Sequence, residues 1–460
     1  MMYSRRKSSE VVVGGVPLGG DNPIRVQSMT TVSTMDTEGV VEQAIRIIEA
    51  GGEYVRMTTQ GTREAGNMKN IRDALRARGY RTPLVADVHF NPAVADVAAE
   101  YVEKVRINPG NYVDPARTFK HLEYTDEEYA AEIKRIRERF VPFLNICREH
   151  GTAIRIGVNH GSLSDRIMSR YGNTPEGMVE SCMEFLRICV EEKFMNVVIS
   201  IKASNTVVMV QTVRLLVRQM ETEGMAFPIH LGVTEAGEGE DGRIKSAVGI
   251  GALLAEGIGD TVRVSLSEAP EKEIPVARKL VAYAAQSAGK RAAAKASIVN
   301  DTITLEYDED NLEDFQLKAA MDAGALLIDG PARELKLTNR NAAVSQAQAD
   351  DTAEAILQAA RVRFSRTEYI SCPGCGRTLY NLEETIARIK QATRHLKGLK
   401  IAIMGCIVNG PGEMADADYG YVGAGRGRIS LYRGKECIEK NIPEADAVER
   451  LLELIESDRK

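Results

Sequence analysis

Eight short apolar segments, each followed by a helical pattern, fill residues 1–285 of the chain. The segments are PIRVQSM, GEYVRMTTQ, PLVADVHF, EKVRINPG, AIRIGVNHG, VVISIKAS, PIHLGVTEAG and TVRVSLSE. Several of the helical patterns between them, such as VVEQAIRIIEAGG, close on glycine, as helix C-termini often do. Strands that alternate with helices are expected to run parallel, and eight such units of this total length predict a TIM (β/α)8 barrel. A doubly wound open sheet is the main alternative. The chain has no GxGxxG after its first strand and no GxxxxGK[ST], which argues against the nucleotide-binding forms of that alternative.

Polar and charged residues gather where the predicted strands end. A TIM barrel presents its active site at the C-terminal ends of its strands. In this chain those ends carry Arg56, Asp87, His89, Arg106, Asn108, Arg155, Asn159, Lys202, Glu235, Arg263 and Ser265. One such arginine is usually a solvated or salt-bridged residue, but five strands of one barrel each place a lysine or arginine near the same rim. Guanidinium groups bind phosphate oxygens as bidentate forks, so the barrel is predicted to bind a polyanionic small molecule. Glu235 lies among these cations as either a proton donor or a charge partner.

The remainder of the chain divides into two parts. Residues 286–362 begin with linker-like SAGKRAAAKAS and continue with the strongly acidic EYDEDNLEDF. Within them FQLKAAMDAGALLIDG predicts one more helix–strand unit, and we interpret the segment as a spacer or a small accessory lobe. Residues 363–460 predict a separate α+β domain with a strand, a Cys-x-x-Cys loop, a helix, a second strand, a hairpin (RISLYRGKECIEK) and a terminal helix.

Three cysteines of this last domain are predicted to meet. Cys372 and Cys375 stand in SCPGCGR, and Cys406 follows a second β run in MGCIVNGPGE. Zinc sites, thioredoxin-like redox pairs and iron–sulfur clusters all use the Cys-x-x-Cys spacing. A zinc knuckle would need a second pair, which is missing, and a redox pair would not need Cys406. On spacing alone, a 4Fe–4S cluster and an irregular zinc site stay equally open. The candidates for a fourth ligand are Cys437, Glu413, Asp416 and Asp418. Cys147, Cys182 and Cys189 lie in amphipathic helical patterns and are interpreted as small buried residues.

Charge and cysteine content limit the class of protein further. The chain has 59 Lys and Arg against 65 Asp and Glu, a net charge of −6, which argues against general nucleic-acid binding. No apolar run approaches the roughly 20 residues of a membrane span, and the N-terminus has no continuous apolar segment of a signal peptide. An odd number of cysteines, seven, favours metal or catalytic roles in a reducing compartment over a disulfide framework. The chain is therefore predicted to be cytoplasmic, without a nucleic-acid or membrane partner.

The motifs together resemble a known enzyme family. SCPGCGR and MGCIVNGPGE, downstream of VADVHF, RINPGN, RIGVNHGSL and GVTEAG, closely resemble 4-hydroxy-3-methylbut-2-enyl diphosphate synthases, oxidoreductases of the methylerythritol phosphate route to isoprenoids. The resemblance covers nearly the whole chain outside 286–362, a segment far shorter than the extra domain of some members. It implies reductive ring opening and dehydroxylation of 2-C-methyl-D-erythritol 2,4-cyclodiphosphate, with a 4Fe–4S cluster and with ferredoxin or flavodoxin as electron donor. It also implies a homodimer in which the cluster of one subunit caps the barrel of its partner.

The resemblance also implies roles for individual residues. It places the cluster ligands at Cys372, Cys375, Cys406 and Glu413, which leaves Cys437 an ordinary hairpin residue. Substrate-holding groups are implied at Arg56, Arg106, Arg155, Asn159, Lys202 and Arg263, pocket lining at Asp87, His89 and Ser265, the barrel acid at Glu235 and a cluster-side contact at Asn409. The alternative of another class is a barrel with a zinc-stabilised C-terminal binding module. Iron and sulfide in the purified protein, or one zinc and no colour, would separate the two.

Overall fold

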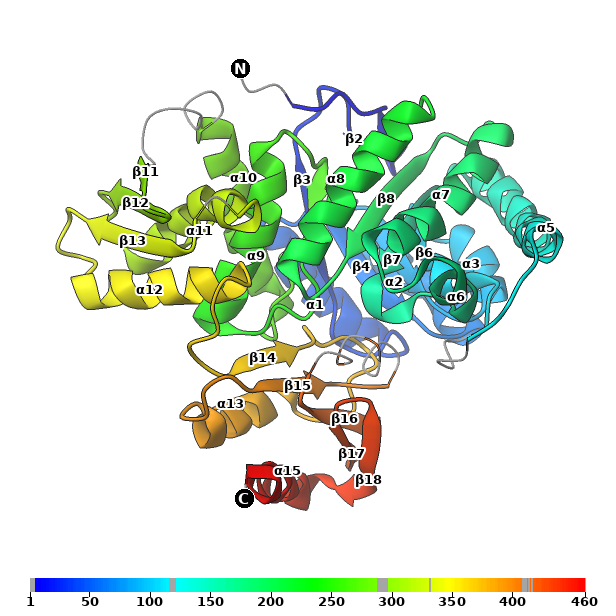
Figure 1. Cartoon of the computed structure of the whole chain (residues 1–460). Coiled ribbons are helices and arrows are strands. Elements are labelled where there is room, and N and C mark those ends of the chain that lie inside the picture. The colour runs from blue at the N-terminus through cyan, green and yellow to red at the C-terminus, as the bar shows by residue number, and fades with distance from the viewer. Residues whose placement is uncertain are drawn as a thin grey trace.

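The eight predicted strands form one parallel barrel. The computed structural model describes residues 5–115, 121–287, 297–330, 332–407, 412, 414 and 417–459. The barrel strands are β3 (Arg25–Met29), β4 (Tyr54–Thr59), β5 (Leu84–Val88), β6 (Lys104–Ile107), β7 (Ala153–Asn159), β8 (Val197–Lys202), β9 (His230–Leu231) and β10 (Thr261–Val262). They pair in the order β8-β7-β6-β5-β4-β3-β10-β9, and a parallel bridge between Ile199 and Ile229 closes the circle. The prediction of a TIM barrel is confirmed (Figure 1).

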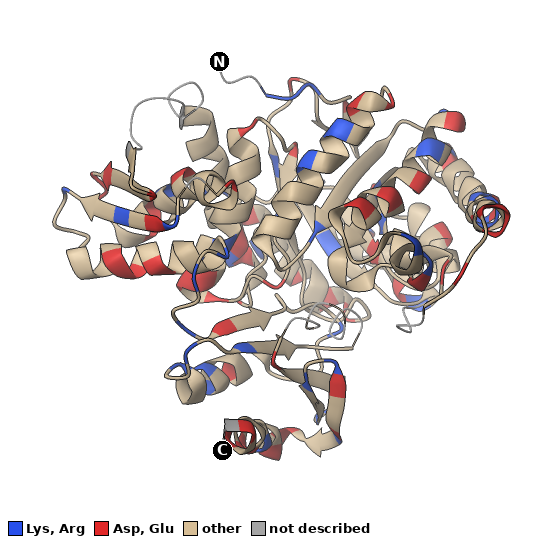
Figure 2. Cartoon of the chain, in the orientation of Figure 1, with Lys and Arg blue, Asp and Glu red and all other residues tan. Residues whose placement is uncertain are grey.

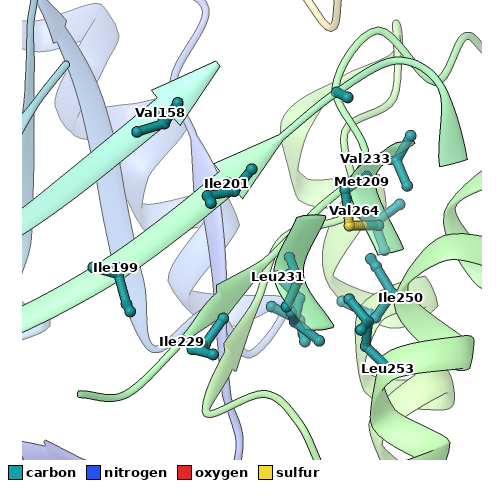
Figure 3. Close-up of a cluster of buried hydrophobic side chains, with 14 of the residues drawn as sticks. Val158, Ile199, Ile201, Met209, Ile229, Leu231, Val233, Ile250, Leu253 and Val264 are labelled. Atoms are coloured by element: carbon teal, nitrogen blue, oxygen red, sulfur yellow. The ribbon is translucent and has the colours of Figure 1, made fainter. Parts of the chain in front are cut away.

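A ring of helices covers the outside of the barrel. The main helices are α1 (Thr37–Glu49), α2 (Thr62–Ala77), α3 (Pro92–Ala99), α5 (Asp126–His150), α7 (Pro175–Glu191), α8 (Thr206–Thr222), α9 (Gly239–Ala255) and α10 (Glu273–Ser287). Short helices α4 (Pro109–Tyr112), η1 (His160–Ser162), α6 (Asp165–Tyr171) and η2 (Pro270–Lys272) lie in the loops after β6, β7 and β10. The helices bury their apolar faces against the strands. Figure 3 shows part of this core, where Ile201 and Leu231 of the sheet gather with Met209, Ile250 and Leu253 of α8 and α9.

A small hairpin closes the N-terminal end of the barrel. Strands β1 (Val11–Val13) and β2 (Val16–Leu18) pair antiparallel. Val11, Val13 and Leu18 pack in one buried cluster with Tyr54 and Val85 at the starts of their strands. The opposite end, where the strands finish, is therefore the end available for a ligand.

Residues 297–362 form a lobe beside the barrel. Its elements are β11 (Ser297–Val299), β12 (Thr302–Tyr307), α11 (Leu312–Ile328), β13 (Glu334–Asn339) and α12 (Gln346–Ala359), with β11 antiparallel and β13 parallel to β12. The helix–strand unit predicted over FQLKAAMDAGALLIDG is present with its strand further along, because the helix α11 continues to Ile328 and the next strand begins at Glu334. Helix α11 packs closely on α9: a Cβ atom on Gly324 would stand 3.0 Å from Cα of Val248. Acidic positions mark the outer helix α12 (Figure 2).

Residues 368–459 form a cap over the C-terminal ends of the barrel strands (Figure 1). Its sheet has the order β14 (Glu368–Ser371), β15 (Lys400–Met404), β16 (Tyr419–Gly425), β17 (Arg428–Arg433) and β18 (Glu436–Pro443), with α13 (Leu382–Thr393) and α15 (Glu444–Arg459) as helices. The first three strands are parallel, and β17 and β18 make the predicted hairpin. Because β14 and β15 are parallel neighbours, the loops that follow them leave the same edge of the sheet. Among the described residues, no helix is long and apolar enough to cross a membrane.

Candidate active site

One cavity lies between the rim of the barrel and the cap of the same chain. It encloses about 730 Å³ of space that is partly open to solvent. Its walls are formed by Met29, Arg56, Arg106, Arg155, Asn159, Ser200, Lys202, Thr234, Glu235, Arg263 and Ser265 from the barrel and by Cys372, Pro373, Gly374, Cys375, Arg377, Met404 and Cys406 from the cap. The predicted barrel pocket and the predicted cysteine site are thus two walls of one cavity.

The cavity has a large excess of positive charge. Its cationic side chains are Arg56, Arg106, Arg155, Lys202, Arg263 and Arg377, none of them more than 9% exposed. Glu235 is the one carboxylate among the described lining residues. Burial lowers the pKa of Lys202 well below its ordinary value, and the neighbouring Arg155 acts in the same direction. Nε and Nη1 of Arg155 are buried without a hydrogen-bond partner among the described residues. Buried cations with unpaired donors are costly, so this wall is suited to an anion that would satisfy them.

Asp87 and His89 lie one layer behind the cavity wall. Both oxygens of the fully buried Asp87 carboxylate accept from arginine, Oδ2 from Arg56 and Oδ1 from Arg106, at 2.8 Å each. Burial alone would raise the pKa of Asp87, but Arg56 and Arg106 hold it well below its usual range. Burial, aided by Arg106, lowers the pKa of His89 to about 3. The ring is therefore neutral at pH 7, and its Nε2 lies 2.5 Å from Nη1 of Arg106. Asp87 and His89 orient the arginines that line the cavity.

Arg263 has a separate partner that the sequence analysis missed. Its Nε and Nη2 donate to Glu273 at 3.0 Å each, and the same carboxylate accepts from the backbone N–H of Leu266. Glu273 is the first residue of α10, after the strand-end segment that holds Arg263. A bidentate pair of this kind fixes the direction of a guanidinium. Arg263 is thus preorganised toward the cavity.

Glu235 is held in an uncommon backbone conformation. Its φ is 48°, in the left-handed region, where a residue other than glycine is strained. Oε2 of Glu235 is buried without a hydrogen-bond partner among the described residues. Burial raises the pKa of its carboxyl group, although Thr234, Lys202 and Lys245 oppose the shift. Burial thus favours the protonated form of this carboxyl group, and the nearby cations favour the ionised form.

The three predicted cysteine ligands share the cap wall. Cys372 directly follows β14, and Cys406 lies two residues after β15, so the parallel pairing of these strands brings their loops together. The backbone N–H of Gly405 donates to Sγ of Cys372 at 3.2 Å. Cys372, Cys375 and Cys406 are all half-buried. These three thiols could hold a cluster at the cavity, facing the cations of the barrel.

Among the residues that the structure describes, no group of three His, Cys, Asp or Glu side chains is arranged to hold a metal ion. Thiolate sulfur is the ligand type that both structural zinc sites and iron–sulfur clusters take.

The other sequence-predicted residues are placed as follows. Asn159 lines the cavity and accepts from Nη2 of Arg106 at 3.3 Å, and Ser265 also lines it. Asn108 lies outside the wall, where its side chain donates to Ser162. Asn409, Glu413 and Asp416 lie outside the described residues. Cys437 and Asp418 are described but do not line the cavity, and Cys147, Cys182 and Cys189 are buried as expected.

Two residues that join the barrel to the cap were missed. Arg377 crosses from the cap to the barrel, where its Nη2 lies 3.3 Å from Oδ2 of Asp87. Ser267 donates to the carbonyl oxygen of Cys372 at 2.8 Å and lies 3.0 Å from Oγ of Ser371. The signal for Arg377 was present in SCPGCGR, the motif that also carries two cysteines. Ser267 could have been found because it follows the last barrel strand, on the side where the strand ends face the cap.

Fold and site together define a TIM-barrel enzyme for a polyanionic small molecule, with a cysteine-bearing cap. The chain matches the GcpE TIM-barrel domain over residues 8–278 and the GcpE protein C-terminal domain over residues 368–457. The chain therefore belongs to the GcpE family.

Full-length relatives support this membership. A 4-hydroxy-3-methylbut-2-en-1-yl diphosphate synthase (flavodoxin) of Bacteroides thetaiotaomicron is 56% identical over 605 aligned positions, which cover 100% of this chain and 98% of the relative. The protein of the same name from Chlorobaculum tepidum is 38% identical over 670 positions, covering 100% of this chain and 90% of the relative. Both alignments exceed the 460 residues of this chain, so both relatives carry residues that this chain lacks.

Proposed function

We propose that this protein is a 4-hydroxy-3-methylbut-2-en-1-yl diphosphate synthase, an oxidoreductase of isoprenoid biosynthesis. Its substrate would be 2-C-methyl-D-erythritol 2,4-cyclodiphosphate. In the net reaction, two electrons and two protons enter, the ring opens, and one hydroxyl group leaves as water. The observation that carries the proposal is a single cavity in which five buried cations of the barrel face three cysteines and one buried cation of the cap.

The barrel wall accounts for recognition of the diphosphate. Arg56 and Arg106 are held in place by Asp87, and Arg263 by Glu273, so these guanidinium groups need little reorganisation when an anion binds. Arg155 and Lys202 supply further positive charge. The phosphate oxygens would take the donors that the protein leaves unpaired. Binding of this kind orients the carbon skeleton toward the cap wall.

The cap would hold the redox group. We propose that Cys372, Cys375 and Cys406 are three ligands of a 4Fe–4S cluster and that Glu413 is the fourth. A cluster at this position supplies electrons one at a time. The buried carboxyl group of Glu235 lies in the same cavity and would donate the proton that the departing hydroxyl group needs.

Three further features belong to the proposal. The electron donor is flavodoxin, which is part of the relatives' enzyme name, or ferredoxin. The thiolate-held cluster is expected to work in the reducing cytoplasm. A homodimer stays a prediction from the resemblance. In this structure the described residues of the cap lie over the barrel of the same chain.

Anaerobic turnover tests the proposal. Purified protein with reduced flavodoxin and the cyclic diphosphate should release the hydroxymethylbutenyl diphosphate, identified by mass spectrometry. Arg106→Ala should lose activity. The matched control is Arg78→Ala, at the exposed C-terminal end of α2, which should keep it. Absence of product from an iron-loaded wild-type protein would refute the proposed activity.

A further inference from the structure

Arg377 is the one described cation of the cap that reaches the cavity. It ends the SCPGCGR motif, and its side chain is only 8% exposed. Its Nη2 lies 3.3 Å from Oδ2 of Asp87, a carboxylate of the barrel. Arg377 lines the cavity together with Cys375 and Cys406, the second and third cysteines of the cap wall. One side chain therefore pairs with a buried barrel carboxylate and lines the cavity beside the predicted cluster ligands.

The local backbone directs Arg377 toward the barrel. Thr378 and Cys375 close a turn, in which N–H of Thr378 donates to the carbonyl of Cys375 at 2.9 Å and Oγ1 of Thr378 accepts from N–H of Cys375. Gly376 lies against the barrel loop after β3, where a Cβ atom would come within 2.9 Å of the carbonyl oxygen of Val32. This close approach leaves no room for a side chain at 376. The turn thus seats the motif on the barrel and buries Arg377.

Asp87 is the shared anchor of this contact. Arg56, Arg106 and Arg377 all approach its carboxylate, so three guanidinium groups share one negative charge. Removing any one of them leaves a net positive cluster, whereas removing Asp87 leaves three buried cations without their counter-ion. Nε of Arg377 is buried without a partner among the described residues, which leaves one donor for a group bound in the cavity.

We propose that Arg377 is a positioning residue that fixes the cysteine loop on the barrel through Asp87 and places a positive charge beside the cluster. The inference rests on the proposed function. A cation next to a cluster favours the reduced form, which carries one more negative charge, and nearby charge and hydrogen bonds are known determinants of cluster potential. Arg377 thereby couples the substrate-binding layer of the barrel to electron acceptance in the cap.

The experiment compares Arg377→Gln and Arg377→Lys with Arg388→Gln, a matched substitution at an exposed position of α13. Iron content is measured first, followed by the midpoint potential of the cluster and by kcat and KM. Arg377→Gln should shift the midpoint potential to more negative values and lower kcat about tenfold or more. Arg377→Lys keeps the charge and should return the potential toward that of the wild type. Arg388→Gln should change neither.

A second readout needs no cluster. In cluster-free protein, hydrogen exchange of the segments 30–36 and 371–378 should be faster in Arg377→Gln than in the wild type, because the ion pair to Asp87 is lost. Unchanged exchange together with an unchanged potential in Arg377→Gln would overturn the inference. An inactive or iron-free wild type would instead refute the proposed function, so the two failures are distinguishable.

Discussion

The barrel wall and the cap wall of the cavity are built in different ways. The barrel wall consists of side chains on the ends of parallel strands, and its cations are almost completely buried. Asp87 and Glu273 hold three of them, Arg56, Arg106 and Arg263. The cap wall consists of loops after β14 and β15, and its three cysteines are half-buried. A rigid, charged wall is suited to substrate binding, and a loop wall is suited to holding a cluster near the surface. Substrate binding and redox chemistry should therefore be separable by mutation.

Several polar contacts of described residues join the barrel to the cap, among them the ion pairs of Lys390 on α13 with Glu238 and Asp241. Ser267 donates to the carbonyl of Cys372, Lys245 of α9 forms a buried ion pair of 3.3 Å with Glu368 at the start of β14, and Arg377 meets Asp87. A parallel bridge between Ala236 and Ser371 adds a backbone contact. The barrel strands pair only with one another, so a change in a cap loop should leave their pairing intact.

The largest effect is expected at the cysteines of the cap. Cys406→Ser should lose most of its iron and all turnover, because the serine hydroxyl does not replace a thiolate ligand. The same protein should still bind the cyclic diphosphate, since the barrel wall is intact. Iron analysis and calorimetric titration of the variant measure the two properties.

Cys437→Ser is the matched control. Cys437 lies in the β17–β18 hairpin and is not among the described residues that line the cavity, so iron and activity should be retained. Full iron occupancy in Cys406→Ser would show that Cys406 is not a cluster ligand. It would also contradict the assignment of cluster binding to the cap wall.

The reverse pattern is expected for arginines of the barrel wall. Arg56→Ala, Arg106→Ala or Arg155→Ala should each weaken binding of the cyclic diphosphate by about 1.5–3 kcal/mol, since each loses charge-assisted hydrogen bonds. That corresponds to roughly 10- to 100-fold in dissociation constant. Iron content should be unchanged. Normal substrate affinity in all three variants would mean that these cations do not form the binding site.

A smaller effect is expected at the contact between the walls. Ser267→Ala removes the hydroxyl that bonds to the carbonyl of Cys372 and should lower kcat/KM by the equivalent of about 0.5–1.5 kcal/mol with iron retained. Ser246→Ala is the control, because its hydroxyl is buried on α9 without a partner among the described residues. Equal kinetics for the two variants would contradict a role of Ser267 in seating the cap.

The smallest effect concerns His89. Its folded-state pKa of about 3 lies below the unfolded value near 6.5, so between these values the unfolded chain binds the extra proton. The stability that His89 contributes is complete above pH 6.5 and is lost as the pH falls toward 3. Between pH 7 and 6 the wild type should lose about 0.7 kcal/mol more than His89→Gln, measured by urea unfolding of cluster-free protein. Parallel pH dependence of the two proteins would show that His89 takes up its proton over the same pH range in the folded and unfolded states.

The barrel could be predicted from the sequence because each of its strand–helix units has a pattern that is visible within a short segment. Each strand is a short apolar run that ends in polar residues, and the strand-end rule brought Arg56, Arg106 and Arg155 to one rim without any knowledge of the rest of the chain. The lobe was less predictable. The apolar run ALLI is too short to distinguish a strand from the last turn of a helix, and only packing of α11 on α9 decides between them.

Contacts between segments far apart in the sequence could not be predicted from local sequence patterns. No sequence feature near Asp87 indicates that it pairs with Arg377, which lies 290 positions further along the chain. Likewise, whether the cap covers its own barrel or that of a partner depends on the path of the connecting lobe, which no motif records. The cysteine loops were predictable as a group because β14 and β15 are adjacent parallel strands.

The central claim is that one cavity holds both a cluster and the substrate-binding cations. Electron paramagnetic resonance of the reduced protein, with and without the cyclic diphosphate, tests it most directly when combined with metal analysis. The account predicts about four iron and four sulfide per chain. It also predicts a spectrum that changes on substrate addition in the wild type but not in Arg106→Ala at the same concentration. A colourless protein with one zinc, or a cluster whose spectrum ignores the substrate, would contradict it.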